Sequence, residues 1–542
     1  MNDVSGQQSS PPGSGIIETI QSLVVAFVLA MVFRGFVMEG FVIPTGSMAP
    51  TLMGQHVHMH SEQTGYDFSI DAGPVMYQLS RMQQGATSET SFKAYDPMLS
   101  TTRPIESPSL RELYSNLRMG DRVLVLKFLP PFFSPKRWDV TVFKNPTDPI
   151  GPAQNYIKRL VGLPREQLLI ADGDIFTGPL DSDVEEFAIQ RKPEYIQRAI
   201  WQPVYDSSFI PVDIQTLEAS TRRAWNGPPW EGAGWDTMDA RTYHWNSDAP
   251  TTLQWDPDTI PINDFTTYNM LRDISQLYPT SDLRLACTIQ VDDPDGFSTS
   301  FAIKARSHIF TFMLQEGRVS TSIEHFESRE QLLEKTADFS LSGSDGILEL
   351  EFWHVDQCMY VFIDGEQILR AAYDDWSPIE RIEYAHFGRT LEQYRAAPTV
   401  QKPTPPSLDW SFSGSSITLH NVRLDRDLYY RPGKLNPGDQ FYVNNDEYIR
   451  GLSFGTDPLK PAIIGEGEYM MLGDNSAASR DSRAWGWPHQ LVRRTFDWNT
   501  PFLVPRQLLV GKAWGVYWPS LIPREPGGAR NIPDFGRWRF IR

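Results

Sequence analysis

Apolar residues form one long run near the N-terminus of the chain. Ile16 to Phe33 includes the stretch LVVAFVLAMVF, with Glu18 near its start and Arg34 directly after its end. A membrane-spanning helix needs about 20 predominantly apolar residues, and charged side chains at its ends reach the headgroups. The pattern therefore predicts a transmembrane anchor over residues 16–36, and we expect the polar residues 1–15 to form a disordered tail.

A cleaved signal peptide is the alternative interpretation of the same segment. Such a peptide has a basic n-region and a small-residue cleavage site. No Lys or Arg precedes Arg34, and the sequence Val32-Phe33-Arg34 is a poor cleavage site. We therefore expect an uncleaved anchor, although the first basic residue lies on its C-terminal side and gives no guide to orientation.

Beyond the anchor, apolar and polar residues alternate over short runs, which is the period of β-strands. A first group of runs predicts an all-β domain, and a second group, with a hairpin turn at Asp364-Gly365, predicts a two-sheet sandwich or jelly roll. The first group is 121–128, 139–144, 156–161 and 168–170, and the pattern returns at 469–472 and 509–513. The second group is 283–291, 298–304, 308–315, 318–324, 347–355, 359–363, 381–388 and 415–424.

The composition of the chain indicates which classes of macromolecule the protein can bind. The chain of 542 residues has 49 Lys and Arg against 67 Asp and Glu, a formal net charge of −18. A chain of this length usually folds as several domains. Proteins bind nucleic acids mainly through Lys and Arg on phosphates, so we expect no nucleic-acid partner.

Cysteine and histidine add little chemistry. Cys287 and Cys358 are the two cysteines, and they form either a disulfide or two buried thiols, which geometry decides. His56, His58 and His60 would share one face of a strand. We interpret them as a solvated strand face rather than a metal site, because no Cys or carboxylate stands at ligand spacing.

One serine lies in a distinctive setting, between glycine and methionine in the stretch 44–51 (PTGSMAPT). A serine hydroxyl needs a neighbouring base to become a nucleophile. The histidines lie in no suggestive context, whereas Lys158 lies in the apolar run 156–161. Burial can lower a lysine pKa from about 10.4 by up to ~3–5 units, which would free the amine to act as a base. Strand alternation would turn Arg159 to the opposite face.

Three stretches, in this order and behind an anchor, resemble the bacterial type I signal peptidases (leader peptidases). These are the membrane-bound serine–lysine enzymes of peptidase family S26, which remove signal peptides from exported proteins. Residues 44–52 are similar to the nucleophile box, 156–164 to the lysine box and 473–486 to the last box, and 120–144 resembles the strands between the first two. The resemblance covers 16–54, 119–178 and 435–520, which is under half of the chain.

The resemblance implies a role for each residue of these boxes. Ser47 would attack the scissile carbonyl, and Lys158 would be the general base. The Ser47 N–H and the Thr45 hydroxyl would form the oxyanion hole, and Ser479 would hydrogen-bond and orient Lys158. The residues implied in ion pairs that hold the last box are Arg159, Asp474, Asp481 and Arg483, and those implied in shallow pockets for small substrate residues are Ile43, Met48, Tyr156 and Ile157. No metal or organic cofactor is implied.

The chain departs from this family in three ways. About 65 residues, from Met53 to Met119, separate the nucleophile box from the next strand, where the family is usually much shorter, and we expect no zinc site there. Ser476 stands where the family commonly has arginine after Gly-Asp-Asn. A long block also separates the lysine box from the last box, and its C-terminal half resembles a laminin-G or concanavalin-like sandwich. Such folds often bind glycans or peptides, but this one could equally be a spacer or a cover for the substrate groove.

Together these observations predict a mainly β protein with a split β-fold catalytic domain and an inserted β-sandwich. The expected parts are the tail 1–15, the anchor 16–36, catalytic segments 37–54, 119–178 and 435–525, a polar insertion 55–118, an irregular insertion 179–280, the sandwich 281–434 and a tail 526–542. We expect a single-pass serine endopeptidase of the cytoplasmic (inner) membrane. Its catalytic domain would be extracytoplasmic, and it would act on the signal peptides of secreted preproteins beside the lipid bilayer.

Two other functions are compatible with parts of this pattern. One is a membrane-anchored binding protein whose sandwich recognises a glycan or peptide on a degenerate peptidase scaffold, against which the intact Ser47, Lys158 and Ser479 speak. The other is a different serine–lysine hydrolase, such as a self-cleaving repressor. The predicted anchor and the lack of a DNA-binding motif disfavour it.

Overall fold

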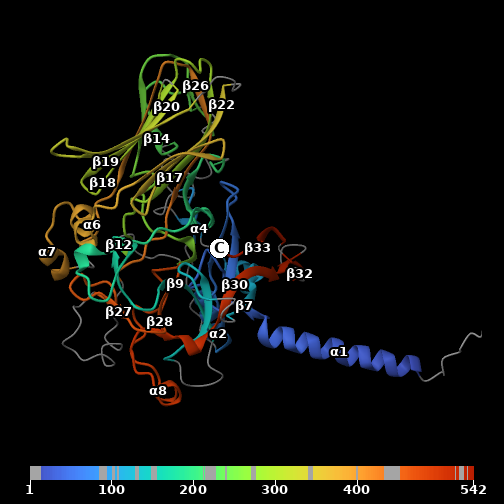
Figure 1. Ribbon diagram of the computed structural model, residues 1–542. Coiled ribbons are helices and arrows are strands. Elements are labelled where there is room, and N and C mark those ends of the chain that lie inside the picture. Colours follow the sequence, from blue (N-terminus) through green and yellow to red (C-terminus); the bar gives the residue numbers. More distant parts are fainter. Residues whose placement is uncertain are drawn as a thin grey trace, which may run out of the picture.

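The structure is a computed structural model that describes most of the chain. The described residues are 14–84, 94–99, 104–106, 109–128, 134–147, 155–211, 213, 227–237, 241–269, 276–315, 317–339, 346–397, 401–432, 452–518, 521–523, 530–533 and 535–542. Most of the predicted N-terminal tail, and part of the predicted tail 526–542, lie outside these residues. The fold is mainly β, as predicted, and Figure 1 shows a long helix, a β core at its end and a tall β-sandwich above the core.

The predicted apolar helix is confirmed as α1 (Ser14–Phe36). Its segment Ile16–Phe36 has a mean hydropathy of 2.2 and no buried share (0%), and it projects away from the rest of the protein (Figure 1). By length and composition it fits a single-pass membrane anchor. Lys127 Nζ donates to the Gly35 carbonyl at 2.8 Å and pairs with Glu39 at 3.0 Å, which ties the end of the helix to the core.

The core sheet is assembled from three separate parts of the chain. Its strand order is β1 (Met38–Val42), β7 (Arg122–Lys127), β30 (Leu509–Trp518), β8 (Val140–Lys144), β9 (Asn155–Gly162), β28 (Glu468–Leu472) and β29 (Val504–Pro505), with β33 (Arg539–Phe540) paired to β30. Neighbouring strands are antiparallel, so residues far apart in sequence become direct neighbours. The predicted strands at 121–128, 139–144, 156–161 and 469–472 all lie in this sheet.

Two smaller sheets flank the core sheet. One has the order β12 (Ala188–Ile189), β11 (Asp174–Gly178), β10 (Glu166–Ala171) and β27 (Ala462–Ile464). The other is built from the polar insertion and has the order β3 (Asp67–Asp71), β2 (His56–His60) and β6 (Leu117–Arg118), with α2 (Gly73–Gln83) and α3 (Leu110–Ser115) beside it. Residues 55–118, predicted to be irregular, therefore contain a small packed unit with its own apolar cluster around Val57 and Ile70.

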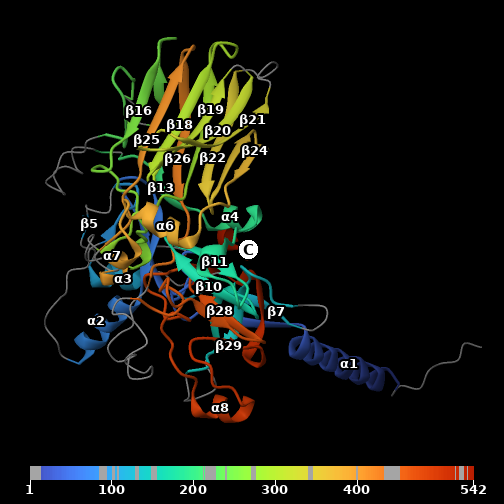
Figure 2. The ribbon, with the colours of Figure 1, turned by 60° about the vertical axis from the view of Figure 1, so that its left-hand side comes forward.

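The sandwich consists of two seven-stranded sheets whose strands run in two layers (Figure 2). The first has β13 (Gln202–Asp206), β26 (Ile417–Arg426), β17 (Leu283–Val291), β22 (Ile347–Val355), β23 (Cys358–Ile363) and β24 (Glu366–Ala372) in this order, with β15 (Tyr243–Trp245) paired to β26. The second has β14 (Trp230–Glu231), β16 (Thr251–Trp255), β25 (Ser407–Ser413), β18 (Ser298–Ala305), β19 (His308–Gln315), β20 (Arg318–His325) and β21 (Gln331–Asp338).

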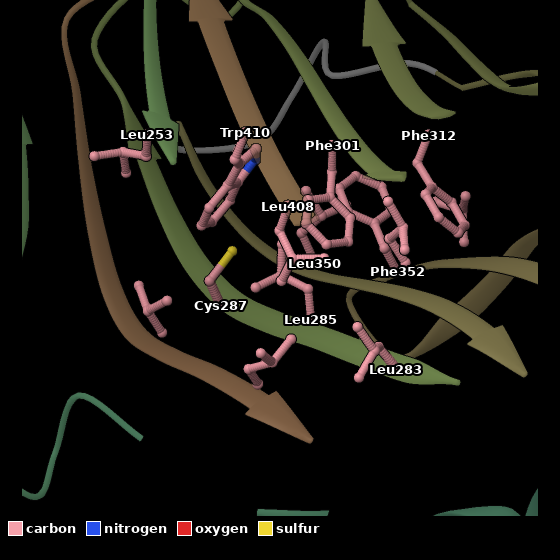
Figure 3. Packing of buried hydrophobic residues seen from close by; sticks show 14 of the residues in the cluster. Leu253, Leu283, Leu285, Cys287, Phe301, Phe312, Leu350, Phe352, Leu408 and Trp410 are labelled. Atoms are coloured by element: carbon pink, nitrogen blue, oxygen red, sulfur yellow. The ribbon is translucent and has the colours of Figure 1, made fainter. Parts of the chain in front are cut away.

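Alternating inward residues of both sheets fill the sandwich core (Figure 3). Phe301 stacks on Phe352 with ring centroids 6.0 Å apart, and Trp230 meets Trp410 edge-on at 5.7 Å. Such aromatic pairs contribute roughly 0.5–1.5 kcal/mol beyond the area that they bury. Cys287 lies in this core, and Cys287 and Cys358 are both buried free thiols. β22 lies between their strands, so the disulfide alternative is wrong.

The sandwich begins earlier in the chain than we predicted. Residues 179–280 contribute β13, β14, β15 and β16 to its two sheets, as well as α4 (Glu194–Ile200) and the 3-10 turns η1 (Val184–Glu186) and η2 (Thr267–Asn269). These strands have two to five residues each, too short to show a period of two. Their tryptophans and tyrosines are core residues, which explains the aromatic composition of this segment.

One predicted strand, 381–388, is wrong because it lies largely in the helix α6 (Pro378–Ala385). Ser377 and Glu380 form a capping box at its start, with proline at the first helical turn, and this is a strong helix-initiation signal. The remaining helices are α7 (Leu391–Ala396) and α8 (Gln490–Phe496), and short 3-10 turns occur at η5 (Arg506–Leu508) and η6 (Phe535–Arg537). Two hairpins, β4 (Ala94–Tyr95) with β5 (Pro104–Glu106) and β31 (Leu521–Pro523) with β32 (Arg530–Pro533), complete the described elements.

A buried network of charges joins the sandwich to the core. Arg381 contacts Asp172 at 3.0 Å and Asp174 at 2.6 Å, both at the turn between β10 and β11. Arg306 contacts the same Asp172 at 2.8 Å and Asp282 at 2.6 Å. Ion pairs of this kind, with both partners removed from water, depend strictly on geometry, because a partner left alone stays buried and charged. The network therefore fixes how the inserted sandwich sits on the core.

Candidate active site

The segment 44–52, which we call the nucleophile loop, follows directly from β1. The Ile43 N–H donates to the Asp121 carbonyl at 2.9 Å, which ends the strand pairing with β7. Two further bonds, from Ala49 N–H to Gly46 O at 3.0 Å and from Leu52 N–H to Met48 O at 2.9 Å, then wind the loop into a turn. Met48 and Leu52 anchor the loop in the apolar core, so the turn presents Ser47 from a fixed base.

Ser47 and Lys158 meet at the centre of this site. Lys158 lies on β9, is only 3% exposed, and donates from Nζ to Ser47 Oγ at 2.5 Å and to the Ile157 carbonyl at 3.1 Å. Burial lowers the pKa of Lys158 to about 8, because the ammonium loses its hydration, although Asp481 and Asp474 oppose the shift. A substantial fraction of this lysine is therefore neutral near pH 8 and able to accept a proton.

Arg159 takes the opposite face of β9, as the strand alternation predicts. Its guanidinium makes a two-point contact with Asp474, Nε to Oδ1 at 2.8 Å and Nη2 to Oδ2 at 2.6 Å, and both side chains are fully buried. Thr51 Oγ1 donates to the same carboxylate at 2.5 Å. Asp474 thus connects the lysine strand to the nucleophile loop.

The last motif closes around the same point. Asp481 accepts from the Gly473 N–H at 3.0 Å and from Arg483 at 2.8 and 2.7 Å. Burial alone would raise the pKa of Asp481, but the Arg483 guanidinium and these hydrogen bonds hold it below its usual value. Ser476 accepts from Arg483 Nη1 at 2.8 Å and from the Arg431 N–H at 2.8 Å. The small hydroxyl at this position therefore receives contacts from an arginine of the motif and from the end of the inserted region.

Ser479 lies beside the site but does not make its predicted contact. A Cβ at Gly473 would stand 2.2 Å from Ser479 Oγ and 2.4 Å from the Ser47 carbonyl, so Ser479 packs across Gly473 from the nucleophile loop. Its hydroxyl makes no hydrogen bond to Lys158 within the described residues. The Lys158 amine turns instead to Ser47 and to its neighbouring carbonyl.

The two predicted oxyanion donors lie close together in the loop. Thr45 is exposed. Its backbone packs closely on Gly54, because a Cβ at Gly54 would stand 2.2 Å from the Thr45 carbonyl carbon, so position 54 has no room for a side chain. The Ser47 N–H has no backbone acceptor among the described residues.

The predicted pocket residues divide into two groups. Ile43, Met48 and Ile157 are at most 7% exposed and pack together beneath the loop. Tyr156 is half-buried, with its ring 6.4 Å from that of Trp485 and 5.5 Å from Lys158 Nζ. The structure brings all four to the site, and of these Tyr156 has the most accessible side chain.

Two residues that contact this site, Tyr268 and Asn269 of η2, lie outside the sequence motifs and were not predicted. The Tyr268 hydroxyl donates to the Gln55 carbonyl at 3.1 Å, and Asn269 exchanges two hydrogen bonds with Asn475 at 2.8 and 2.7 Å. They come from the segment 179–280, where the sequence has no period to signal a buried side chain. Only the unusual density of aromatic residues hints that this segment packs against something.

The three histidines of β2 do not form the solvated strand face that we predicted, because His56 is fully buried. His58 and His60 both contact Asp67, at 3.3 and 2.9 Å, and burial lowers the pKa of His56 to about 4. Four carboxylates also come within 4.8 Å of one another, namely Asp174, Asp282, Asp356 and Asp427. Lys192 lies 2.8 Å from Asp427 and also contacts Asp356, while Arg381 and Arg306 pair with Asp174 and Asp282. The carboxylates thus have cationic partners in the chain itself.

Comparison with known proteins points to one family. A family model described as "Signal peptidase, peptidase S26" matches residues 16–81 and 98–199, which include Ser47 and Lys158 but not the last motif. The match supports a relationship to the signal peptidases over these stretches, which amount to less than half of the chain. No curated protein sequence matches.

Several solved structures are similar to a part of the chain. They include the carbohydrate-binding module CBM66 from Bacillus subtilis, at 10% identity and TM-score 0.22, which covers 37% of this chain and 97% of that one. Sheep galectin-11 has 14% identity and TM-score 0.18 and covers 27% and 92%. Galectin LEC-6 of Caenorhabditis elegans has 12% identity and TM-score 0.20 and covers 34% and 95%. At these scores we draw nothing about ligands from them.

Proposed function

We propose that this protein is a membrane-anchored serine endopeptidase that removes N-terminal signal peptides from exported preproteins, with Ser47 as nucleophile and Lys158 as general base. The observation that carries the proposal is the 2.5 Å contact between Lys158 Nζ and Ser47 Oγ, made by a lysine whose buried position lowers its pKa to about 8. The partial match to signal peptidases supports the same assignment.

The reaction would proceed as acyl transfer. Neutral Lys158 takes the proton from the Ser47 hydroxyl as the oxygen attacks the scissile carbonyl, and the same lysine then gives that proton to the leaving amine. The Ser47 N–H and the Thr45 hydroxyl would stabilise the oxyanion, where one donor typically contributes about 2.7–4 kcal/mol. Water, deprotonated by Lys158, would then release the acyl group. Ser479 would act by packing beside the loop, and Asp474, Asp481, Arg159 and Arg483 by holding the lysine strand in place.

The core sheet offers edges on which an extended peptide could bind. β1 is the outermost strand, and the first half of β9, from Asn155 to Lys158, has a partner only on its β8 side. A peptide could pair with such an edge through its backbone while side chains enter shallow pockets. The half-buried Tyr156 next to Lys158 would border the pocket for a small residue before the cut, with Ile43, Met48 and Ile157 as its floor.

The surface near β1 suits a position at the bilayer. Exposed aromatic side chains gather on β30, η6 and β33, which are strands and turns of the core sheet and its neighbours. They are Trp514, Tyr517, Trp518, Phe535, Trp538 and Phe540. Aromatic rings with one polar end favour the membrane interface. We place the site on the extracytoplasmic side of the cytoplasmic membrane, where the short apolar region of a signal peptide, about 7–15 residues, ends.

The alternative of a glycan- or peptide-binding sandwich gains no specific support. The outward residues of the three central strands of the second sheet, β25, β18 and β19, are mostly small or polar, and none of them is aromatic. They include Asp409, Ser411, Ser300, Ala302, Lys304, Thr311 and the two apolar residues Ile309 and Met313. The middle of that face therefore carries no described ring on which a sugar could stack.

Processing of a preprotein by the full-length protein in detergent tests the proposal. Ser47→Ala and Lys158→Ala should each lower cleavage by at least ~10³-fold, as expected when a nucleophile or its base is lost. Lys144→Ala is the matched control, because Lys144 is exposed on the neighbouring strand β8 and should leave cleavage unchanged. Wild-type cleavage by the Ser47→Ala protein would refute the proposed function.

A further inference from the structure

A short segment of the inserted region lies directly against the nucleophile loop. Residues 263–269, which we call the clamp segment, end in η2 (Thr267–Asn269). They belong to the long insertion that separates the lysine strand from the last motif, so nothing in the motifs anticipates them. Tyr268, in the middle of η2, is only 3% exposed although the turn belongs to no sheet. Its burial is against the loop that carries Ser47.

The Tyr268 ring occupies the space beside Gly46, the residue before Ser47. A Cβ at Gly46 would stand 1.8 Å from Tyr268 Cε1 and 2.4 Å from its hydroxyl oxygen, so only glycine fits there while the ring is in place. Gly46 is not among the residues with positive φ, so space and not backbone conformation requires glycine. The Tyr268 hydroxyl reaches on to the Gln55 carbonyl at 3.1 Å. Tyr268 therefore contacts the start of the nucleophile loop at Gly46 and the chain just beyond its end at Gln55.

Asn269 acts on the same loop through Asn475. The two side-chain amides exchange hydrogen bonds, from Asn269 Nδ2 to Asn475 Oδ1 at 2.8 Å and from Asn475 Nδ2 to Asn269 Oδ1 at 2.7 Å. Asn475 then donates from Nδ2 to the Gly46 carbonyl at 3.0 Å and from its backbone N–H to the Ser47 carbonyl at 3.1 Å. Asn475, held in place by Asn269, thus fixes the peptide groups on both sides of the Ser47 Cα.

The clamp segment is itself held by the inserted region. Arg426, at the end of β26, donates to the Phe265 carbonyl at 2.8 Å. Arg431 donates to Asp264 at 2.9 Å, and the Asp264 N–H donates to the Tyr278 carbonyl at 2.9 Å. These contacts connect the sandwich strand β26 to the nucleophile loop through a few buried residues. The insertion therefore has a rigid path to the Ser47 backbone.

We infer that Tyr268 and Asn269 are positioning residues for Ser47, and that the inserted region is an integral part of the hydrolytic site and not a separable module. The inference rests on the proposed function. An attacking oxygen must reach the carbonyl within about 3–3.5 Å, and a displacement of ~1 Å can cost about 10²-fold in rate. Gly46 has no side chain that could pack against its surroundings and restrain its backbone. The Tyr268 ring and the Asn269–Asn475 amide pair restrain it instead, and Tyr268 and Asn269 lie outside the sequence motifs.

The test compares point variants of the full-length protein in detergent, with a preprotein as substrate. Tyr268→Ala and Asn269→Ala should lower kcat by about 10–100-fold while KM changes less than ~3-fold, because they move the nucleophile without touching the substrate. Tyr268→Phe keeps the ring over Gly46 and should stay within ~3-fold of wild type. Tyr243→Ala, which removes a buried tyrosine inside the sandwich, is the control for general destabilisation and should leave kcat per folded molecule unchanged.

A double variant tests the contact itself. Gly46→Ala forces a methyl group into the Tyr268 ring and should lower kcat more than Tyr268→Ala does. Gly46→Ala combined with Tyr268→Ala should be at least as active as Gly46→Ala alone, because the clash has gone, and such non-additivity marks residues in direct contact. If Tyr268→Ala does not accumulate as folded protein, Asn269→Ala decides alone.

The two proposals fail in different ways. A kcat of Tyr268→Ala and Asn269→Ala within ~3-fold of wild type, in an assay where Ser47→Ala is inactive, overturns the positioning role and leaves the peptidase intact. Cleavage by Ser47→Ala overturns the peptidase itself. A fall in activity that follows the folded fraction of each variant, as for Tyr243→Ala, would reduce the clamp segment to a structural role.

Discussion

Arg159 and Asp474 form a two-point ion pair between fully buried side chains, although 315 positions separate them in the chain. Arg159 follows Lys158 on β9, and Asp474 follows β28 and accepts a hydrogen bond from Thr51 of the nucleophile loop. One carboxylate therefore ties together the lysine strand, the last motif and the loop of Ser47. The pair lies on the face of β9 opposite to the Lys158 amine, so it can hold the lysine strand without contacting the reacting atoms.

Breaking this pair should destabilise the core strongly. Arg159→Met leaves the Asp474 carboxylate buried without its partner, which typically costs about 3–5 kcal/mol. Urea unfolding followed by tryptophan fluorescence measures the loss. Arg165→Ala is the matched control, because Arg165 and Glu466 form an ion pair with 66% and 78% exposed side chains, where the expected loss is below ~1 kcal/mol. Equal losses for the two variants would contradict the importance of the buried pair.

The pH dependence of cleavage should report Lys158. Because burial lowers its pKa to about 8 and the neutral amine is the base, kcat/KM should rise about tenfold per pH unit below pH 8 and level off above it. Initial rates between pH 6 and 9.5, with the folded fraction checked at each pH, measure the profile. A profile that is flat over this range, or that falls as pH rises through 8, would exclude a buried lysine base.

The same burial should make Lys158 costly to stability. The folded state holds the pKa of Lys158 at about 8 whereas the unfolded chain has the usual lysine value of 10.5, so below pH 8 folding disfavours the ammonium by roughly 3 kcal/mol. Lys158→Met should therefore be inactive yet more stable than wild type at pH 7. Between pH 8 and 10.5 the unfolded state binds the extra proton, so wild-type stability rises and the gap should close. A gap that stays constant over this range would contradict the shift.

Asp174 and Arg381 contact each other where the core meets the sandwich, and their substitution should change the stability of the protein by different amounts. Burial and the neighbouring Asp282 raise the pKa of Asp174 well above its usual value, although Arg381 opposes the shift, so ionising Asp174 costs more free energy in the folded state than in the unfolded chain. Asp174→Asn keeps an acceptor for Arg381 and should be no less stable than wild type at pH 7, with wild type losing ground as pH rises from 4. Arg381→Met removes a fully buried guanidinium from Asp172 and Asp174 and should cost about 3–5 kcal/mol. Thermal unfolding at pH 4 and pH 7 compares the two variants with wild type, and equal losses would contradict the raised pKa of Asp174.

Local sequence was enough to predict the parts of the site that follow from one strand or one run. The apolar run gave α1, and the alternation around 156–161 placed Lys158 and Arg159 on opposite faces of a strand, as the structure has them. Both results depend on a period that a few adjacent residues display by themselves. The helix α6 carries an equally local signal in its capping box at Ser377 and Glu380, and the strand predicted over 381–388 is wrong because this signal starts a helix at Pro378.

The amino-acid sequence by itself determined the anchor, the β-rich character and the chemistry available at Ser47 and Lys158, because residue type and short-range period are properties of the chain. Only the tertiary structure decided that Ser479 packs across Gly473 without reaching Lys158, that residues 179–280 complete the sandwich, and that Tyr268 fills the space beside Gly46. Contacts of this kind join residues hundreds of positions apart and leave no local pattern. They follow from how the three parts of the core sheet and the inserted region close on one another.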